Sequence, residues 1–239
     1  MKEGSLSEGR SPGRSRWRIA GVCAAVCLLL SSPAAGQDRP KEKIVYRIST
    51  GGYAEYHDMG VVERNGRQVR MVTFKTYIGG LMDGFERIYG EADTFLPLRI
   101  ERDVRFAFRK EYLIEDYDPP SSSVTIKKYV RDRFAAEFRI VKDRPIQNAI
   151  LLRSYLKTIP DLRVGWSVDI SIPDPYTVTL ESFEDIEVPG GKFPTYHFVS
   201  KPRQFELWVT RDASRIPVKL AVKKGYRTSV EMKAYSVSP

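Results

Sequence analysis

The sequence predicts a mainly β protein, built as one large curved antiparallel sheet or open half-barrel with one or two helices on its concave face. Three observations support this fold class. Apolar residues recur at every second position over long stretches, as between Leu98 and Phe108, with charged residues between them. Tight-turn signals such as Asn65-Gly66 separate these stretches. Few segments carry a helical pattern, and strands with one apolar and one polar face are typical of antiparallel sheets.

Residues 1–36 are typical of a secretory signal peptide. Basic residues precede an apolar run of 12 residues, Ile19–Leu30, and small residues follow up to Gly36. The run is shorter than the roughly 20 residues that span a bilayer, although an uncleaved anchor helix stays open as an alternative. We expect cleavage near Gly36, export to the periplasm, and no transmembrane segment in the mature chain.

Both cysteines of the chain, Cys23 and Cys27, lie in the apolar run of this leader. Each follows a valine, whereas a lipidated cysteine would follow a small residue, so we do not expect a lipoprotein. The mature chain of 203 residues (239 minus 36) then has no cysteine for disulfides, thiol chemistry or metal binding. Its length suits one hydrophobic core, and we predict a single β-rich domain over residues 37–239.

Alternating apolar residues predict strands along the whole mature chain. The expected strands are Lys43–Ser49, Ala54–Glu63, Gln68–Tyr77, Leu98–Phe108, Glu111–Asp116, Val124–Val130, Ala136–Val141, Trp166–Ile172, Tyr176–Val188, Phe193–Ser200, Phe205–Thr210, Ile216–Lys223 and Thr228–Tyr235. Turns are predicted at Asn65-Gly66, at Pro189-Gly190-Gly191 and around Gly225. The proline- and serine-rich segment 118–123 is interpreted as a surface turn within one domain, because the composition does not change across it.

Two segments are predicted to be helical. Met82–Tyr89 is short and is bounded by glycines on both sides. Ile146–Lys157 is longer, has an apolar stripe that includes Ile150, Leu151 and Tyr155, and is followed by Pro160. We expect this second helix to lie across one face of the sheet.

The sequence carries no pattern that points to catalysis, a metal or a cofactor. The only histidines, His57 and His197, are not in a metal-ligand spacing, and no nucleophile elbow or phosphate-binding loop is present. The acidic run at Glu115–Asp118 lacks the spacing of a calcium-binding loop. We therefore predict a non-enzymatic protein without cofactor or metal, with a hydrolase that uses two converging carboxylates left open as an alternative.

Nucleic acid is not an expected partner. Removal of the leader takes five basic and two acidic residues away, which lowers the net charge from +9 to +6. The remaining basic residues are interleaved with acidic ones, whereas nucleic-acid-binding proteins gather them on one face or arm.

Large apolar side chains on otherwise polar strand faces are the strongest functional signal. Trp208 lies between Glu206 and Thr210, and Phe183 lies in a similarly acidic stretch. Tyr196 and Phe198 add bulk to the second face of their strand. Either a helix covers this face, in which case these residues belong to the core, or sheet and helix leave an apolar cavity for a ligand.

The C-terminal half resembles the periplasmic conserved hypothetical proteins of domain-of-unknown-function family 3108. The residues that carry this resemblance are Leu152-Arg153, Gly165, Val188-Pro189 with Gly191, Leu207-Trp208, Asp212 and Ile216-Pro217-Val218. The resemblance implies a fold similar to that of LolA-type lipoprotein carriers, with helices in the concave side of an open half-barrel. It also implies a periplasmic location and an apolar ligand, and it carries no known catalytic residues.

These observations lead to two functional hypotheses. The first is an envelope protein that binds a lipid, an acyl chain or a lipoprotein in an apolar cleft, with the helix Ile146–Lys157 as a lid. The second is a structural or assembly factor that contacts an envelope protein partner and has no ligand cavity. The residues expected to line the cleft are Trp208, Phe183, Tyr196 and Phe198 from the sheet and Ile150, Leu151 and Tyr155 from the helix.

Overall fold

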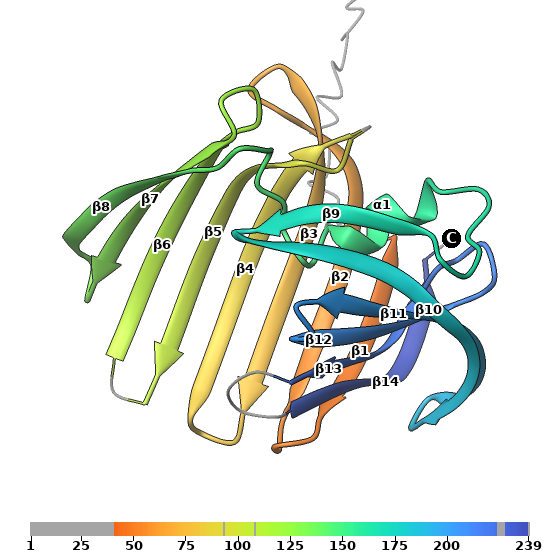
Figure 1. The fold of residues 1–239 in the computed structure, drawn as a ribbon. Coiled ribbons are helices and arrows are strands. Elements are labelled where there is room, and N and C mark those ends of the chain that lie inside the picture. Colours follow the sequence, from red (N-terminus) through yellow and green to blue (C-terminus); the bar gives the residue numbers. More distant parts are fainter. Residues whose placement is uncertain (1–40, 93, 108, 224–227, 239) are drawn as a thin grey trace, which may run out of the picture. The chain divides into compact units, whose positions relative to one another are not determined.

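A single antiparallel sheet runs through the part of the chain that the structure describes (Figure 1). The structure is a computed structural model, and it describes residues 41–92, 94–107, 109–223 and 228–238. The predicted leader, residues 1–36, lies outside the described residues. Within them the sheet has 14 strands in the order β8-β7-β6-β5-β4-β3-β2-β1-β14-β13-β12-β11-β10-β9. The predicted large antiparallel sheet is thus confirmed, and it is not closed because β8 and β9 do not pair.

The strands follow one another along the chain with short connections. The N-terminal strands are β1 (Glu42–Ile48), β2 (Tyr53–Arg64), β3 (Arg67–Ile78), β4 (Met82–Glu91), β5 (Pro97–Phe106), β6 (Arg109–Asp118), β7 (Ser123–Val130) and β8 (Arg133–Val141). The C-terminal strands are β9 (Ser167–Ile172), β10 (Asp174–Val188), β11 (Gly191–Lys201), β12 (Phe205–Thr210), β13 (Pro217–Val222) and β14 (Thr228–Val237). Each strand pairs with the strands before and after it in the sequence, except that β8 and β9 do not pair with each other. In addition, the first strand, β1, pairs with the last, β14.

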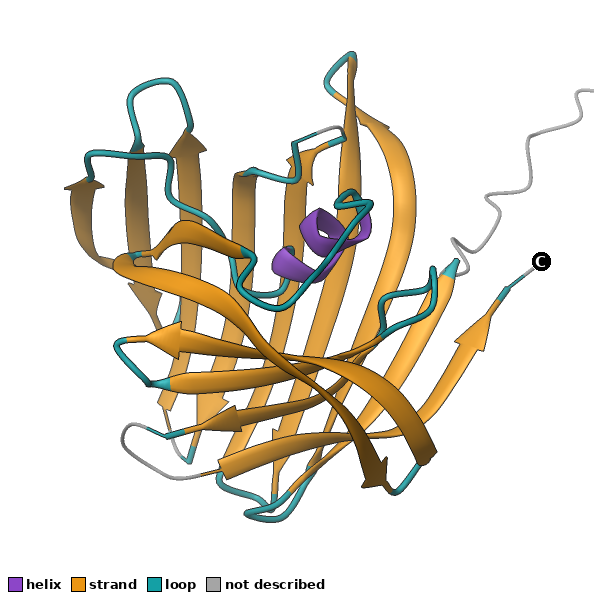
Figure 2. Ribbon diagram, turned by 45° about the vertical axis from the view of Figure 1, so that its right-hand side comes forward, coloured by secondary structure: helices purple, strands orange, loops and turns teal. Residues whose placement is uncertain are grey.

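The sheet folds back on itself. Figure 2 shows the C-terminal strands crossing in front of the N-terminal ones, with the helix between the two groups. This helix is α1 (Leu152–Lys157), the one α-helix of the described residues. No helix in the described part of the chain is long and apolar enough to cross a membrane.

The predicted turns can be checked at three positions. Asn65 and Gly66 connect β2 with β3 and have φ values of 52° and 74°, as a two-residue hairpin turn requires. Pro189 and Gly190 connect β10 with β11. The segment from Asp118 to Ser123 connects two paired strands of the same sheet, so it is a turn within one domain. The predicted turn at Gly225 lies outside the described residues.

The prediction of a helix at Met82–Tyr89 is wrong, because this segment is strand β4. Its buried face carries Gly84, Ile88 and Gly90. Two glycines on the buried face hide the apolar alternation from a reading of the sequence. Gly90 leaves room for a neighbour: a side chain at this position would meet Leu151 Cδ1 at 2.9 Å.

The predicted helix Ile146–Lys157 is also too long, since only its second half is helical. In the first half, the side chain of Asn148 accepts a hydrogen bond from the Ile150 N–H at 2.8 Å. Gln147 N–H donates to the Ser171 carbonyl at 2.7 Å, which ties this half to β9. Asparagine side chains that bind the backbone two residues on favour turns over helices, so α1 begins only at Leu152.

Two buried clusters form the core, and the segment around α1 lies between them. Leu151 packs into the first cluster, whose members include Ile44, Ile88 and Ile100 of β1, β4 and β5. Leu152 and Leu156 pack into the second cluster, on β9–β12; its other members are Leu162, Ile170, Val178, Leu180, Tyr196, Phe198, Leu207 and Val209. Neighbouring residues of this segment thus face opposite walls and hold them apart.

Candidate functional site

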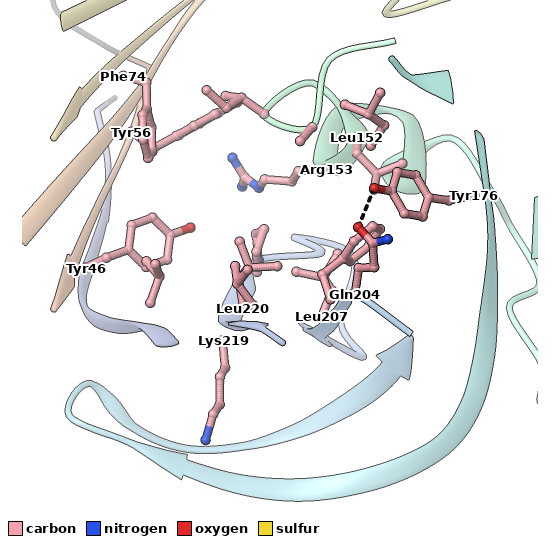
Figure 3. Close-up of a pocket in the computed structure, with 17 residues that line it drawn as sticks. Tyr46, Tyr56, Phe74, Leu152, Arg153, Tyr176, Gln204, Leu207, Lys219 and Leu220 are labelled. Atoms are coloured by element: carbon pink, nitrogen blue, oxygen red, sulfur yellow. Dashed lines mark hydrogen bonds between the residues drawn. The ribbon is translucent and has the colours of Figure 1, made fainter. Parts of the chain in front are cut away.

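An apolar cavity of about 520 Å³ lies between the two parts of the sheet, beside α1 (Figure 3). Its lining comes from β1–β3, from the segment that carries α1, and from β9, β10 and β12–β14. The lining residues are Tyr46, Tyr56, Phe74, Ala149, Ile150, Leu152, Arg153, Ile172, Tyr176, Gln204, Phe205, Leu207, Pro217, Lys219, Leu220, Val222 and Val230. Most of these side chains are aliphatic or aromatic, so an occupant is held mainly by apolar contact.

Strand register explains why these side chains face the same space. Leu207 pairs with Leu220, and Leu220 pairs with Val230 on the next strand. Paired residues of antiparallel strands lie on the same face, so the three form one continuous wall. Tyr56 and Phe74 form an equivalent pair on β2 and β3 and contribute to another wall.

Few polar groups reach the cavity. The Tyr176 hydroxyl donates a hydrogen bond to Gln204 Oε1 at 2.8 Å, which joins β10 to the turn before β12 (dashed line in Figure 3). Burial raises the pKa of Tyr56 to about 12, and the Asp58 carboxylate adds to this effect. Burial also raises the pKa of Tyr46 well above its ordinary value. Both hydroxyls on these walls are therefore neutral over the physiological range.

Arg153 is the charged group that α1 places at the cavity. Its side chain is only 3% exposed, and Nη2 lies 2.7 Å from Glu42 Oε2. The guanidinium carbon lies 5.2 Å from the centre of the Tyr56 ring. Burial alone would lower the pKa of Arg153, but Tyr56, Glu42 and Tyr46 outweigh burial and raise it. The guanidinium is thus a permanent positive charge in an apolar environment.

The three residues predicted from the helix lie at or near the cavity. Ile150 lines it directly. Leu151 and Tyr155 line a small recess on the other side of the same segment, next to β9. Leu151 is 1% exposed and packs against Gly90.

Trp208 does not line the cavity, although the sequence made it the leading candidate. Its pairing with His197 places it on the face opposite to Leu207. There its ring stacks on His197 with 4.4 Å between centroids and an interplanar angle of 5°. Trp208 Nε1 donates a hydrogen bond to Glu184 Oε2 at 3.0 Å, the largest of the contacts that lower the pKa of Glu184. Trp208 is therefore buried on the other face, where it belongs to the first core cluster and its ring also contacts His197 and Glu184.

The remaining predicted residues, Tyr196, Phe198 and Phe183, lie on the face with Leu207 but not at the cavity. Tyr196 and Phe198 are buried in the second core cluster with Leu152 and Leu156. Phe183 pairs with Tyr196, because a bulge between Leu180 and Ser182 shifts the alternation of β10 by one residue. The sequence left open whether the helix covers these side chains or leaves a cavity beside them. The structure packs Tyr196 and Phe198 against the helix residues Leu152 and Leu156.

Sequence reasoning missed most of the cavity lining for two reasons. Tyr46, Tyr56 and Phe74 belong to strands more than a hundred residues before β12, and no sequence pattern indicates which strands face one another. Leu207 and Leu220 belong to the ordinary apolar alternation of their strands, so nothing in their spacing distinguishes a cavity wall from a packed core. One signal was available: Arg153 interrupts the apolar stripe of its helix, and a charge at such a position points to a buried ion pair or a site.

The comparisons with known proteins inform the fold. No family model matches the sequence, and no curated protein matches it. Among solved structures, the chain is similar to a β-barrel-like protein of domain of unknown function DUF1849 from Brucella abortus. The two share 8% sequence identity at a TM-score of 0.53, and the match covers 84% of this chain and 99% of that chain. At this identity the likeness is one of fold alone.

The predicted resemblance to domain-of-unknown-function family 3108 is therefore wrong. The similar structure belongs to DUF1849, a different family, and no comparison supports a likeness to LolA-type carriers. The motifs that carried the prediction, such as Val188-Pro189 and Ile216-Pro217-Val218, are turn and strand-entry patterns. Many antiparallel sheets need such patterns at similar spacing, so their order does not identify a family.

Proposed function

We propose that this protein is an exported, non-enzymatic envelope protein that holds the hydrocarbon chain of a lipid in the cavity beside α1. The observation that supports this most is the cavity, about 520 Å³ lined by side chains such as Leu207, Leu220 and Phe74. Pockets of a few hundred cubic ångströms with few polar groups are typical of small-molecule sites. The signal-peptide pattern of residues 1–36 supports export.

The pattern of hydrogen bonding favours a hydrocarbon chain over a polar ligand. Tyr176 and Gln204 satisfy each other across the cavity wall. Apart from Arg153 and the hydroxyl of Tyr56, the lining then offers little to a ligand that needs hydrogen bonds. A hydrocarbon chain needs none, and each buried methylene contributes about 0.8 kcal/mol before the costs of binding.

A displacement assay tests this proposal. Nile red, a neutral apolar dye, is bound to the purified protein and displaced by palmitate, by hexadecanol or by extracted envelope lipid. We expect displacement with a dissociation constant between about 1 µM and 0.1 mM, as about 0.3 kcal/mol or more per ligand atom implies. Mass spectrometry of lipid that copurifies with the protein gives an independent readout.

A pair of tryptophan variants shows whether the lipid occupies this cavity. Ala149 is exposed and lines the cavity, so Ala149→Trp should obstruct it with little effect on the core and weaken binding at least tenfold. Ala136 is exposed on β8, outside the cavity, and Ala136→Trp should leave binding unchanged. Equal effects of the two variants would mean that the lipid binds outside this cavity and would contradict the proposal. No displacement by any lipid would favour the alternative of an assembly factor without a ligand.

A further inference from the structure

Hydrocarbon binding leaves one feature of the cavity unexplained, namely the guanidinium of Arg153. Figure 3 shows it between Tyr46 and Tyr56, among the apolar lining residues. One nitrogen is engaged: Nη2 lies 2.7 Å from Glu42 Oε2 and donates to the Ser214 carbonyl at 3.5 Å. A cavity for hydrocarbon alone gains nothing from a buried cation, because desolvation of the charge is costly.

The other two nitrogens of Arg153 lack partners. Nε and Nη1 are buried and make no hydrogen bond to any described residue. They carry three of the five N–H groups of the guanidinium. The hydroxyl of Tyr56 is likewise buried; its neighbours Arg153 and Ser154 act to lower its pKa, but no side chain in the described part of the chain has the geometry of a hydrogen bond to it. Buried donors are almost always satisfied in native proteins, so this group of atoms points to a ligand that supplies acceptors.

The charge around Arg153 is not balanced. Glu42 contacts two cations, since Lys157 Nζ lies 2.7 Å from Oε1 of the same carboxylate. One negative and two positive charges leave an excess of one positive charge. Lys219, the other cationic residue of the lining, extends away from Arg153 in Figure 3 and lies 3.4 Å from Glu231 Oε1.

We infer that the cavity selects amphiphiles with an anionic oxygen head group, a carboxylate or a phosphate, which binds to Nε and Nη1 of Arg153 while the hydrocarbon chain lies along Leu207 and Leu220. This inference rests on the proposed function and specifies its class of ligand. The planar fork of a guanidinium matches the paired oxygens of carboxylates and phosphates. The apolar surroundings strengthen such a contact and disfavour a cationic head group beside Arg153.

Ligands with the same chain and different heads test this selectivity. Nile red is displaced at pH 8 by palmitate, hexadecyl phosphate, hexadecanol and hexadecyltrimethylammonium. We expect at least one of the two anions to bind tenfold or more tightly than hexadecanol, and the cation to bind more weakly than hexadecanol. Which anion binds more tightly identifies the head group as a carboxylate or a phosphate. Inorganic phosphate alone should not displace the dye.

Three variants assign the selectivity to Arg153. The double variant Arg153→Met with Glu42→Gln removes both charges of the ion pair, so neither partner is left buried alone. It should bind hexadecanol as the wild type does and lose the preference for anions. Lys157→Met removes the other cation near Glu42 but not a cavity residue, and it should keep the preference. Arg153→Lys should keep part of it, because the charge remains without the fork.

The outcomes separate this inference from the proposed function. If hexadecanol and both anions bind equally, or if the double variant keeps the preference, Arg153 does not read the head group, although the cavity still binds hydrocarbon. If inorganic phosphate binds alone as tightly as the amphiphiles, the site is an anion site and the inference fails. If no amphiphile displaces the dye, the proposed function itself fails.

Discussion

Glu42 connects β1 to the helix through two cations. Lys157 Nζ lies 2.7 Å from Oε1 and Arg153 Nη2 lies 2.7 Å from Oε2. Burial alone would raise the pKa of Glu42, but these two cations outweigh burial and lower it. Because the pKa of the folded state is below that of the unfolded state, Glu42 contributes stability at neutral pH. That contribution is lost as the pH falls through the folded-state pKa.

Unfolding in urea at several pH values tests this role. We expect Glu42→Gln to destabilise the protein by about 3 kcal/mol at pH 7, since it leaves the buried Arg153 without its counter-charge. The gap between wild type and variant should shrink as the pH falls below about 4.3, the ordinary pKa of glutamate, because the wild-type carboxylate is then protonated. Glu63→Gln, at an exposed position, should change stability by less than about 0.5 kcal/mol. A gap that is constant from pH 7 to pH 3 would contradict this account.

At the scale of elements, the segment around α1 packs closely against β4 because β4 has a glycine, Gly90, at the contact. Gly90 on β4 leaves the space that Leu151 occupies. This contact sets the distance between the sheet and the segment that carries Ile150 and Arg153, both of which line the cavity. The glycine that hid β4 from sequence analysis is therefore part of what holds the cavity in place.

Alanine substitutions at two glycines of β4 measure this fit. Gly90→Ala places a methyl group 2.9 Å from Leu151 Cδ1 and 3.2 Å from the Leu96 carbonyl oxygen, and overpacking of this kind costs about 1–3 kcal/mol. Gly84→Ala meets only Met82 Cε at 3.5 Å and should stabilise the protein by about 0.4–1 kcal/mol, because the unfolded chain loses conformational freedom. Urea unfolding of both variants checks the signs. Destabilisation of similar size at both positions would show that Gly90 has no special role.

For the described domain as a whole, the first and last strands meet in the middle of the sheet. β1 pairs with β2 on one side and with β14 on the other, and its buried residues Ile44, Tyr46 and Ile48 belong to the first core cluster. At one edge of the sheet, β8 pairs only with β7, and eight of its nine residues are exposed. The core therefore covers β1 and the strands around it, and the second cluster covers β9–β12, but neither cluster includes a residue of β8.

Hydrogen exchange should reveal this uneven distribution of stability. We expect the amides of β1 to exchange only on global unfolding, because both of its edges are paired and one face is buried. The amides of β8 should exchange orders of magnitude faster through local opening. Exchange measured by mass spectrometry on peptides from 42–48 and 133–141 compares the two directly. Equal protection of both peptides would mean that the sheet opens only as a unit.

Residue spacing and turn chemistry alone determined the class of this fold. Alternation with period two identified nearly all the strands, and positive-φ residues such as Asn65 and Gly66 marked where the chain reverses. These signals are local, so one sequence suffices to read them. Local patterns failed to predict strand β4, where the packing of Leu151 requires a glycine at position 90. They also failed to predict the start of α1, where the side chain of Asn148 binds the Ile150 N–H and forms a turn.

Only the tertiary structure decided where the site lies. The partner of Trp208 across the strand pair is His197, and this register directs the tryptophan away from the cavity. The return of the sheet on itself brings β1–β3 opposite β12–β14, and it sets Arg153 between their side chains. Register and the pairing of distant strands depend on contacts between residues far apart in the sequence. An alternation pattern shows that a side chain is buried, but it does not show what that side chain faces.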